Sequence, residues 1–250
     1  MMKTETKELM KLIQICHENL QNSDEIKNYL KKRKIDEYLV NKYKIGFFPQ
    51  NLDILSKYVN FNVLREKKII KVNNTSDFNE YHYLVIPVFD EYGEPVGISG
   101  RTLLGDKERG ILGIPKYKNS SYQKTNILYG LNHSFDSIIE KDCVFVVEGY
   151  FDQISFHKNG VKNSVAICGT AFSKNHLLKL RRLCKKIYII LDNDEAGIRS
   201  SSALNKKFNK YSGCYSFLKC IDKNIKDIDD FFNQKSLVDF KKYYKVYHPY

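Results

Sequence analysis

The sequence predicts an α/β fold, with a parallel sheet flanked by helices and an α+β part before it. Three observations support this fold class. Residues 1–45 carry apolar positions at helical spacing, residues 65–100 carry short extended runs, and apolar strands alternate with helical segments from residue 142 onward. Such alternation is typical of a parallel sheet with helices on both faces. The 250 residues allow one large domain or two small ones.

The first 60 residues are predicted to be mainly helical. The apolar positions between Leu9 and Cys16 define the first helix, and Ser23 is suited to cap the second. Pro49 interrupts the pattern. The expected helical segments are residues 9–16, 24–34, 37–43 and 51–59.

Extended segments follow this helical part. Strands are expected at residues 69–72, 83–88 and 95–99, with a turn at 90–94. Residues 105–126 are largely polar and contain further glycines and one proline. They are predicted to form a long loop, and loops of that length are often functional.

The C-terminal half is predicted to alternate strands and helices. Its wholly apolar runs suit strands that are covered on both faces. The expected strands are residues 143–147, 164–168, 187–191 and 215–218. The expected helices are residues 150–158, 173–183 (capped by Ser173) and 195–208. Residues 243–250 carry no clear signal.

Acidic residues directly follow two of these strands. Glu148 follows the first strand of the C-terminal half, and Asp192 follows the third, with Asp194 two residues later. Ligands of open parallel sheets bind at the carboxyl ends of the strands, so these side chains should meet at one edge. Asp152 lies one turn into the next helix and can point back to that edge.

A third acidic cluster, Asp227, Asp229 and Asp230, follows another turn-and-strand segment. Gathered carboxylates repel one another unless cations neutralise them. Hard divalent cations take oxygen ligands, and a pair of them can stabilise the attacking and leaving oxygens of an in-line displacement. Gly149 is expected to let the backbone approach a ligand, and Gly197 to loosen the turn after the Asp pair. A single Glu-Gly or Asp-x-Asp would only indicate a polar turn, but the combined arrangement predicts a metal site.

Composition and charge are consistent with a globular protein that has a polyanionic partner. The formal net charge is +12, which favours phosphate binding, although an AT-rich genome would also enrich Lys, Asn, Ile and Tyr. No apolar stretch approaches the roughly 18 residues of a membrane span, and no signal peptide is visible. We therefore expect a cytoplasmic protein without a membrane partner. The six cysteines lack zinc-ligand spacing, so no zinc site is predicted.

At the acidic residues the sequence resembles a Toprim domain. Residues 148–152 resemble the glutamate motif of that fold, and residues 192–197 resemble its DxD motif followed by Ala-Gly. The resemblance narrows to DnaG-type bacterial primases and covers about residues 25–235. The further stretches that resemble primase motifs are 29–33, 44–49, 86–90, 97–101, 115–120, 128–131, 160–163, 168–171 and 226–230.

The resemblance implies synthesis of a short RNA primer from ribonucleoside triphosphates on single-stranded DNA, with Mg²⁺ or Mn²⁺. It makes Glu148 an acid/base or metal-coordinating residue. The implied metal ligands are Asp192, Asp194 and Asp227, with Asp152 and Asp229 in support. The implied contacts to nucleotide phosphate or template are Arg101, Lys116 and Lys124. A basic residue in a polar loop can equally be only solvated.

The resemblance also implies a domain organisation. Residues 1–135 would form a primase-like N-terminal subdomain, 136–235 the Toprim domain and 236–250 a C-terminal tail. The family's zinc-binding and helicase-binding domains are not expected, and residues 78–83 stand where relatives carry an arginine-rich run. We therefore expect replicative helicase and a separate zinc-binding protein as partners. The sequence could come from a bacterial chromosome or from a phage or other mobile element. It could also be a fragment of a longer protein.

Two other functions stay open beside primer synthesis. A Toprim nuclease would use the same metals for hydrolysis, but it would not need the motifs between residues 86 and 131. A non-catalytic module that binds DNA or the replisome would not need acids at every matched position. A topoisomerase is disfavoured, because 250 residues leave little room for strand-passage domains.

Overall fold

The computed structural model describes residues 3–169 and 171–249, which divide into two compact units. Unit 1 comprises Met1–Phe89 and Gly93–Tyr122, and unit 2 comprises Asp90–Tyr92 and Gln123–Tyr250. None of the helices over the described residues is long and apolar enough to cross a membrane.

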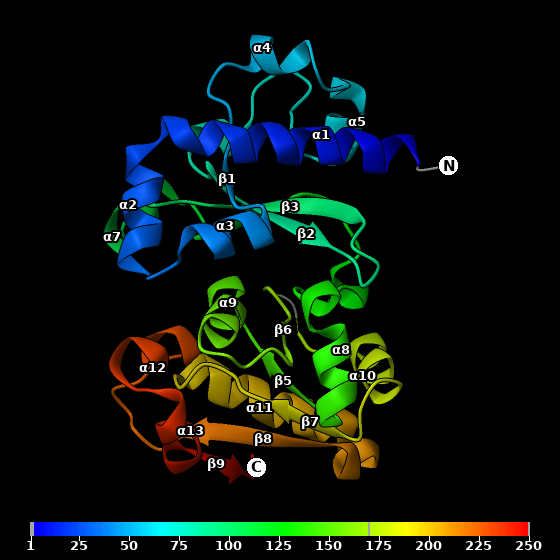
Figure 1. The fold of residues 1–250 in the computed structure, drawn as a ribbon, viewed down its shortest axis with the longest axis vertical. Coiled ribbons are helices and arrows are strands. Elements are labelled where there is room, and N and C mark those ends of the chain that lie inside the picture. Colours follow the sequence, from blue (N-terminus) through cyan, green and yellow to red (C-terminus); the bar gives the residue numbers. More distant parts are fainter. Residues whose placement is uncertain (1–2, 170, 250) are drawn as a thin grey trace. The chain divides into compact units, whose positions relative to one another are not determined.

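Unit 1 packs helices on a small antiparallel sheet (Figure 1). The strands, in the order β1-β2-β3-β4, are β1 (Gly46–Phe47), β2 (Leu84–Phe89), β3 (Pro95–Arg101) and β4 (Tyr117–Asn119). The helices are α1 (Thr4–Asn19), η1 (Leu20–Asn22), α2 (Asp24–Lys32), α3 (Glu37–Tyr43), α4 (Leu52–Ser56), α5 (Phe61–Glu66), α6 (Asp77–Glu80) and α7 (Asp106–Leu112). The predicted helices and the strands at 83–88 and 95–99 are confirmed, and the Ser23 side chain caps α2 by accepting a hydrogen bond from the Ile26 N–H at 3.3 Å.

The core of unit 1 forms where the apolar stripe of α1 meets the sheet. Leu12 and Ile13 pack in one cluster with Val85 and Ile98. Gly46 makes the close approach of α1 possible, because a Cβ atom there would lie 2.5 Å from the backbone carbonyl carbon of Cys16. The helical period of residues 9–16 thus decides which side of α1 the sheet covers.

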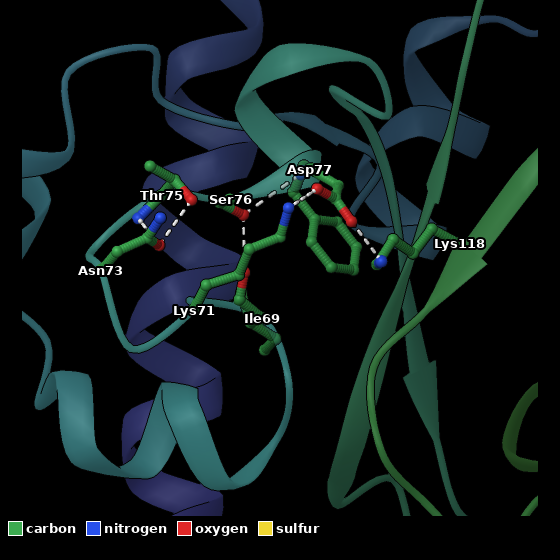
Figure 2. Close-up of polar contacts among 8 residues, drawn as sticks. Ile69, Lys71, Asn73, Thr75, Ser76, Asp77 and Lys118 are labelled. Atoms are coloured by element: carbon green, nitrogen blue, oxygen red, sulfur yellow. Dashed lines mark hydrogen bonds and ion pairs between the residues drawn. The ribbon is translucent and has the colours of Figure 1, made fainter. Parts of the chain in front are cut away.

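The strand predicted at residues 69–72 is wrong. The N–H groups of Ile69 and Ile70 both donate back to the Leu64 carbonyl, at 2.8 and 3.3 Å, so this segment closes the end of α5 instead of entering a sheet. Figure 2 shows the polar contacts that follow it. Ser76 Oγ donates to the Ile69 carbonyl at 2.6 Å, and Asp77 binds both Lys71 and Lys118.

The long loop predicted at residues 105–126 contains regular structure. The Gly105 N–H donates to Glu108 Oε2 at 2.9 Å at the start of α7, and Gly113 ends that helix with a φ of +65°. β4 pairs with β3, and η2 (Lys124–Asn126) follows. None of the α7 residues is buried, so the helix leaves no apolar stripe in the sequence to reveal it.

Unit 2 contains the predicted parallel sheet, in the strand order β6-β5-β7-β8-β9. Its strands are β5 (Cys143–Val147), β6 (Ser164–Ala166), β7 (Lys186–Ile189), β8 (Tyr215–Cys220) and β9 (Tyr244–Tyr247). Its helices are α8 (Leu131–Lys141), α9 (Tyr150–Lys158), α10 (Lys174–Arg181), α11 (Glu195–Phe208), η3 (Asn209–Cys214), α12 (Ile228–Gln234) and α13 (Leu237–Tyr243). The strands are parallel except β9, which runs antiparallel to β8.

Helices cover both faces of this sheet, as predicted. On one face, Val146 and Ile189 pack with residues of α8, α10 and α11, among them Leu204. On the other face, the Phe145 ring lies 5.4 Å from the Phe156 ring of α9, centroid to centroid, and α12 and α13 add further aromatic rings.

Two element bounds differ from the predicted division of the chain. The boundary placed at residue 135 falls inside α8, and residues 236–250, expected as a tail, supply α13 and the edge strand β9. The Tyr244 ring of β9 stacks on the Phe240 ring at 4.6 Å, centroid to centroid. Phe240 and Tyr244 of this segment are therefore buried inside unit 2.

Candidate metal centre

The centre of the acidic cluster lies at the carboxyl ends of β5 and β7. These strands pair in parallel, with Val146 opposite Ile189, so the residues that follow them meet at one edge. The backbone N–H of Asp192 donates to Glu148 Oε1 at 2.8 Å. The juxtaposition of Glu148 and Asp192 that the strand pattern predicts is therefore present in the structure.

Asp194 caps α11 at the same edge. Its Oδ1 accepts a hydrogen bond from the Gly197 N–H at 2.9 Å. A Cβ atom on Gly197 would lie 1.9 Å from the carbonyl oxygen of Asp192. Only glycine lets the first turn of α11 approach Asp192 this closely. The role of Gly197 is therefore to avoid a steric clash, and not to loosen the turn as expected.

Asp227 reaches the cluster from the N-terminus of α12. Its Oδ1 accepts a hydrogen bond from the Asp230 N–H at 2.8 Å. Asn193 connects this loop to the Asp192 loop, because its backbone N–H donates to the Lys226 carbonyl at 2.7 Å. Its side chain also donates to the carbonyls of Asp222 and Ile225. Sequence reasoning missed this role of Asn193, since its partners lie about 30 residues away and no local pattern marks them.

Asp152 and Asp229 lie below this edge and are buried. Asp152 accepts hydrogen bonds from the Gly149 N–H at 3.0 Å and from the Asp229 N–H at 3.1 Å, one on each carboxylate oxygen. Ser155 Oγ donates to Asp229 Oδ1. One oxygen of Asp152 thus caps its own helix α9 and the other joins α9 to α12, so the geometry favours a supporting role for Asp152 over direct ligation.

The carboxylates of the cluster perturb one another. Burial and the negative charges of Glu148 and Asp227 raise the pKa of Asp192 to about 7. Burial, Asp194 and Asp227 raise the pKa of Glu148, although the Asp192 N–H and Lys226 oppose that shift. Burial followed by the charge of Asp227 raises the pKa of Asp152 well above its ordinary value. The cluster is thus a region of concentrated negative potential.

These residues fit a hard divalent cation by donor type and by charge. Glu148, Asp192, Asp194 and Asp227 offer only carboxylate oxygens, and a cation would relieve the repulsion that raises the pKa values. Over residues 3–169 and 171–249, no group of three or more His, Cys, Asp or Glu side chains is already arranged to hold a metal ion. The side chains of Asp194 and Asp227 are instead held as helix caps, each by a hydrogen bond from a backbone N–H.

The three predicted basic residues differ in environment. Arg101 of unit 1 is only 8% exposed, and its guanidinium lies over the rings of Tyr29 and Tyr117, at 5.3 and 5.1 Å from their centroids. Lys116 of unit 1 is exposed. Lys124 of unit 2 is half-buried, and its carbonyl lies 3.0 Å from the ring Nε2 of His176.

Two family models match the chain in sequence order. Residues 15–135 match the N-terminal domain of the DNA primase catalytic core, and residues 145–232 match a Toprim-like domain. The chain belongs to the family of DnaG-type primase catalytic cores. The predicted resemblance and fold class are therefore confirmed.

Individual relatives of this primase core agree with the assignment. The chain is 37% identical over 191 residues to the DNA primase of Rickettsia typhi, and the match covers 72% of this chain and 31% of the relative. The chain spans about a third of the length of the curated relatives it matches, from 31 to 37%.

Solved primase structures resemble the core along almost its whole length. The Aquifex aeolicus primase, comprising zinc-binding and RNA polymerase domains, matches with a TM-score of 0.81 and 26% identity over 96% of this chain and 60% of that one. The RNA polymerase domain of Mycobacterium tuberculosis primase DnaG matches with a TM-score of 0.81 and 25% identity over 96% of this chain and 82% of that one. That domain has also been solved in complex with double-stranded DNA.

Proposed function

We propose that this primase core joins ribonucleotides into a short primer on single-stranded DNA by metal-dependent nucleotidyl transfer. The observation that carries the proposal is the position of Glu148. Its carboxylate is held by the Asp192 N–H at 2.8 Å, inside a cluster of acids from the ends of two parallel strands. The family membership of both halves of the chain supports the same reaction.

In the proposed reaction, the 3′-hydroxyl of one nucleotide attacks the α-phosphorus of a ribonucleoside triphosphate. A phosphodiester bond forms, the bond to the β-phosphate oxygen breaks and pyrophosphate leaves. Glu148 accepts the hydroxyl proton, and its burial, the largest cause of its raised pKa, favours that role. Asp192, Asp194 and Asp227 would hold Mg²⁺ or Mn²⁺, which when bound neutralises charge on the phosphate oxygens.

The remaining acids position this machinery. Asp152 and Asp229 join α9 to α12, because Asp152 accepts the Asp229 N–H and Asp229 accepts a hydrogen bond from Ser155. Lys116 and Lys124 are proposed to contact nucleotide or template phosphate. Arg101 is proposed to do so through a small exposed portion while its guanidinium also donates to the Tyr117 hydroxyl at 2.5 Å. Replicative helicase and a separate zinc-binding protein are proposed partners for recruitment and template selection.

The proposal is tested by incorporation of labelled ribonucleotides on a single-stranded DNA template with Mg²⁺ or Mn²⁺. Asp192→Ala should abolish the short products, whereas Asp136→Ala, which removes an exposed acid on α8, should leave them unchanged. Parallel reactions contain helicase and a zinc-binding protein. Metal-dependent loss of the template without new products would replace primer synthesis with nuclease activity. Absence of both activities, with partners present, would favour a non-catalytic module.

A further inference from the structure

A groove of about 860 Å³ in unit 2 extends from Asp194 to the strands β8 and β9. Residues at the α11 N-terminus line it, including Asp194 and Glu195. Lys219, Lys223 and Lys245 also line it, on β8, in the turn after β8 and on β9. The groove therefore adjoins the acidic cluster but also carries three lysines, and its volume lies in the range of ligand sites.

Two of these lysines stand directly opposite one another. Lys219 of β8 pairs with Lys245 of β9 in the antiparallel register, next to the pair formed by Cys220 and Tyr244. Directly opposite residues share one face of a sheet, so both lysine side chains leave the same face. Like charges in that position destabilise a strand pair unless an anion lies between them.

No carboxylate neutralises this pair among the described residues. Lys245 Nζ donates to the neutral carbonyl of Lys241 at 2.8 Å, and Lys219 Nζ lies 5.3 Å from the centroid of the Tyr247 ring. Of the two acids that line the groove, Glu195 forms an ion pair with Arg199 at 3.3 Å and Asp194 accepts the Gly197 N–H at 2.9 Å. The positive charge of Lys219 and Lys245 is therefore available to a ligand.

The same groove also offers apolar contact. Tyr247, which is half-buried because it also packs against the core of unit 2, lines the groove together with Ile198, Ile221 and Val246, which are 37, 59 and 58% exposed. Cationic side chains beside an accessible aromatic edge or face are the combination with which proteins hold single strands, since phosphates bind the charges and bases contact the ring. A free inorganic anion would make no use of the apolar part.

We propose that this groove binds a single-stranded nucleic acid, with a backbone phosphate between Lys219 and Lys245 and a base against Tyr247. The bound strand extends toward Asp194. The groove thus holds a strand that enters or leaves the acidic cluster, and in this respect the inference rests on the proposed function.

The test is fluorescence anisotropy of a labelled oligothymidylate of about 12 nucleotides, within the site sizes of single-strand binders. It is carried out without divalent metal, so that no catalysis is required. The double variant Lys219→Gln/Lys245→Gln should weaken binding roughly tenfold and lower the slope of log Kd against log salt by about 0.7 per lost phosphate contact. Tyr247→Leu should weaken binding with little change in that slope.

Matched variants separate a contact from a general charge effect. Lys219→Arg/Lys245→Arg should retain binding. Lys241→Gln/Lys242→Gln removes the same charge from α13, at residues that do not line the groove. The proposal would be overturned if both glutamine pairs weakened binding equally. It would also be overturned if inorganic triphosphate displaced the labelled oligonucleotide as effectively as unlabelled oligonucleotide does. Thermal unfolding of each variant establishes that it is folded.

The outcome is distinguishable from failure of the proposed function. Lysine-dependent binding by a chain that incorporates no ribonucleotide would retain the groove and overturn primer synthesis. Incorporation that depends on Asp192, together with unchanged oligonucleotide binding by the lysine variants, would overturn the groove alone.

Discussion

The backbone N–H of Asp192 donates a hydrogen bond to Glu148 Oε1 at 2.8 Å. This contact joins the ends of two neighbouring parallel strands and holds the carboxylate of one acidic motif against the backbone of the other. Because the donor is a backbone group, the contact persists when the Asp192 side chain is changed. The side chains of Glu148 and Asp192 can therefore be tested separately.

Glu148→Gln should separate charge from position. The amide oxygen can still accept the Asp192 N–H, but the proton acceptor is lost, so ribonucleotide incorporation should fall by about 100-fold or more. Thermal stability should be unchanged or higher, because one of several repelling carboxylates is removed. Retention of activity within about tenfold of the native chain would rule out Glu148 as the general base.

Mg²⁺ or Mn²⁺ should raise the melting temperature of the native chain. A ligand present at about 100 times its Kd adds about 2.7 kcal/mol of stability if it binds only the folded state. Asp192→Asn should reduce this shift, whereas Asp136→Asn should not. The comparison is made by thermal unfolding with metal and with chelator. An identical shift in Asp192→Asn would place the metal elsewhere.

Gly197→Ala should damage the candidate site through backbone geometry alone. Its Cβ atom would lie 1.9 Å from the Asp192 carbonyl oxygen, so α11 must move away, at a cost of about 1–3 kcal/mol. Incorporation should fall together with the melting temperature. Gly110→Ala in α7 is the control, since no atom lies within 4 Å of its Cβ position and the substitution favours the helix. Equal stability of the two variants would contradict the close contact.

Protonation of Asp77 should make unit 1 less stable in acid. Burial alone would raise its pKa, but hydrogen bonds from Lys118 and Lys71 outweigh burial and lower it below the ordinary value (Figure 2). The stabilisation is therefore complete above the unfolded-state pKa of about 3.9 and is lost as the pH falls through the lower folded-state pKa. Asp77→Asn should remove up to about 1 kcal/mol at neutral pH and flatten the acid limb of a stability–pH curve. A curve parallel to that of the native chain would contradict this linkage.

Local patterns predict much of the fold. The starts of α2 and α10 are predictable because Ser23 and Ser173 have cap chemistry that the next few residues complete. The strands and helices between residues 143 and 208 are predictable because their apolar runs are long and regular. The prediction fails at residues 69–72 because two buried isoleucines at the end of a short helix have the same composition as a strand.

The sequence predicts the order of strands and helices in unit 2, because that order depends on the spacing of apolar residues. It also predicts that the acids meet at one edge of the sheet, because each acid follows directly after a strand. How those acids are held depends on tertiary structure. Asn193 binds carbonyls about 30 residues away, and Asp152 binds the N–H of a residue on α12. Tertiary structure also places Lys219 opposite Lys245, because the register of β9 depends on how α13 packs. Such contacts join residues far apart in the chain, and they exist only once the chain has folded.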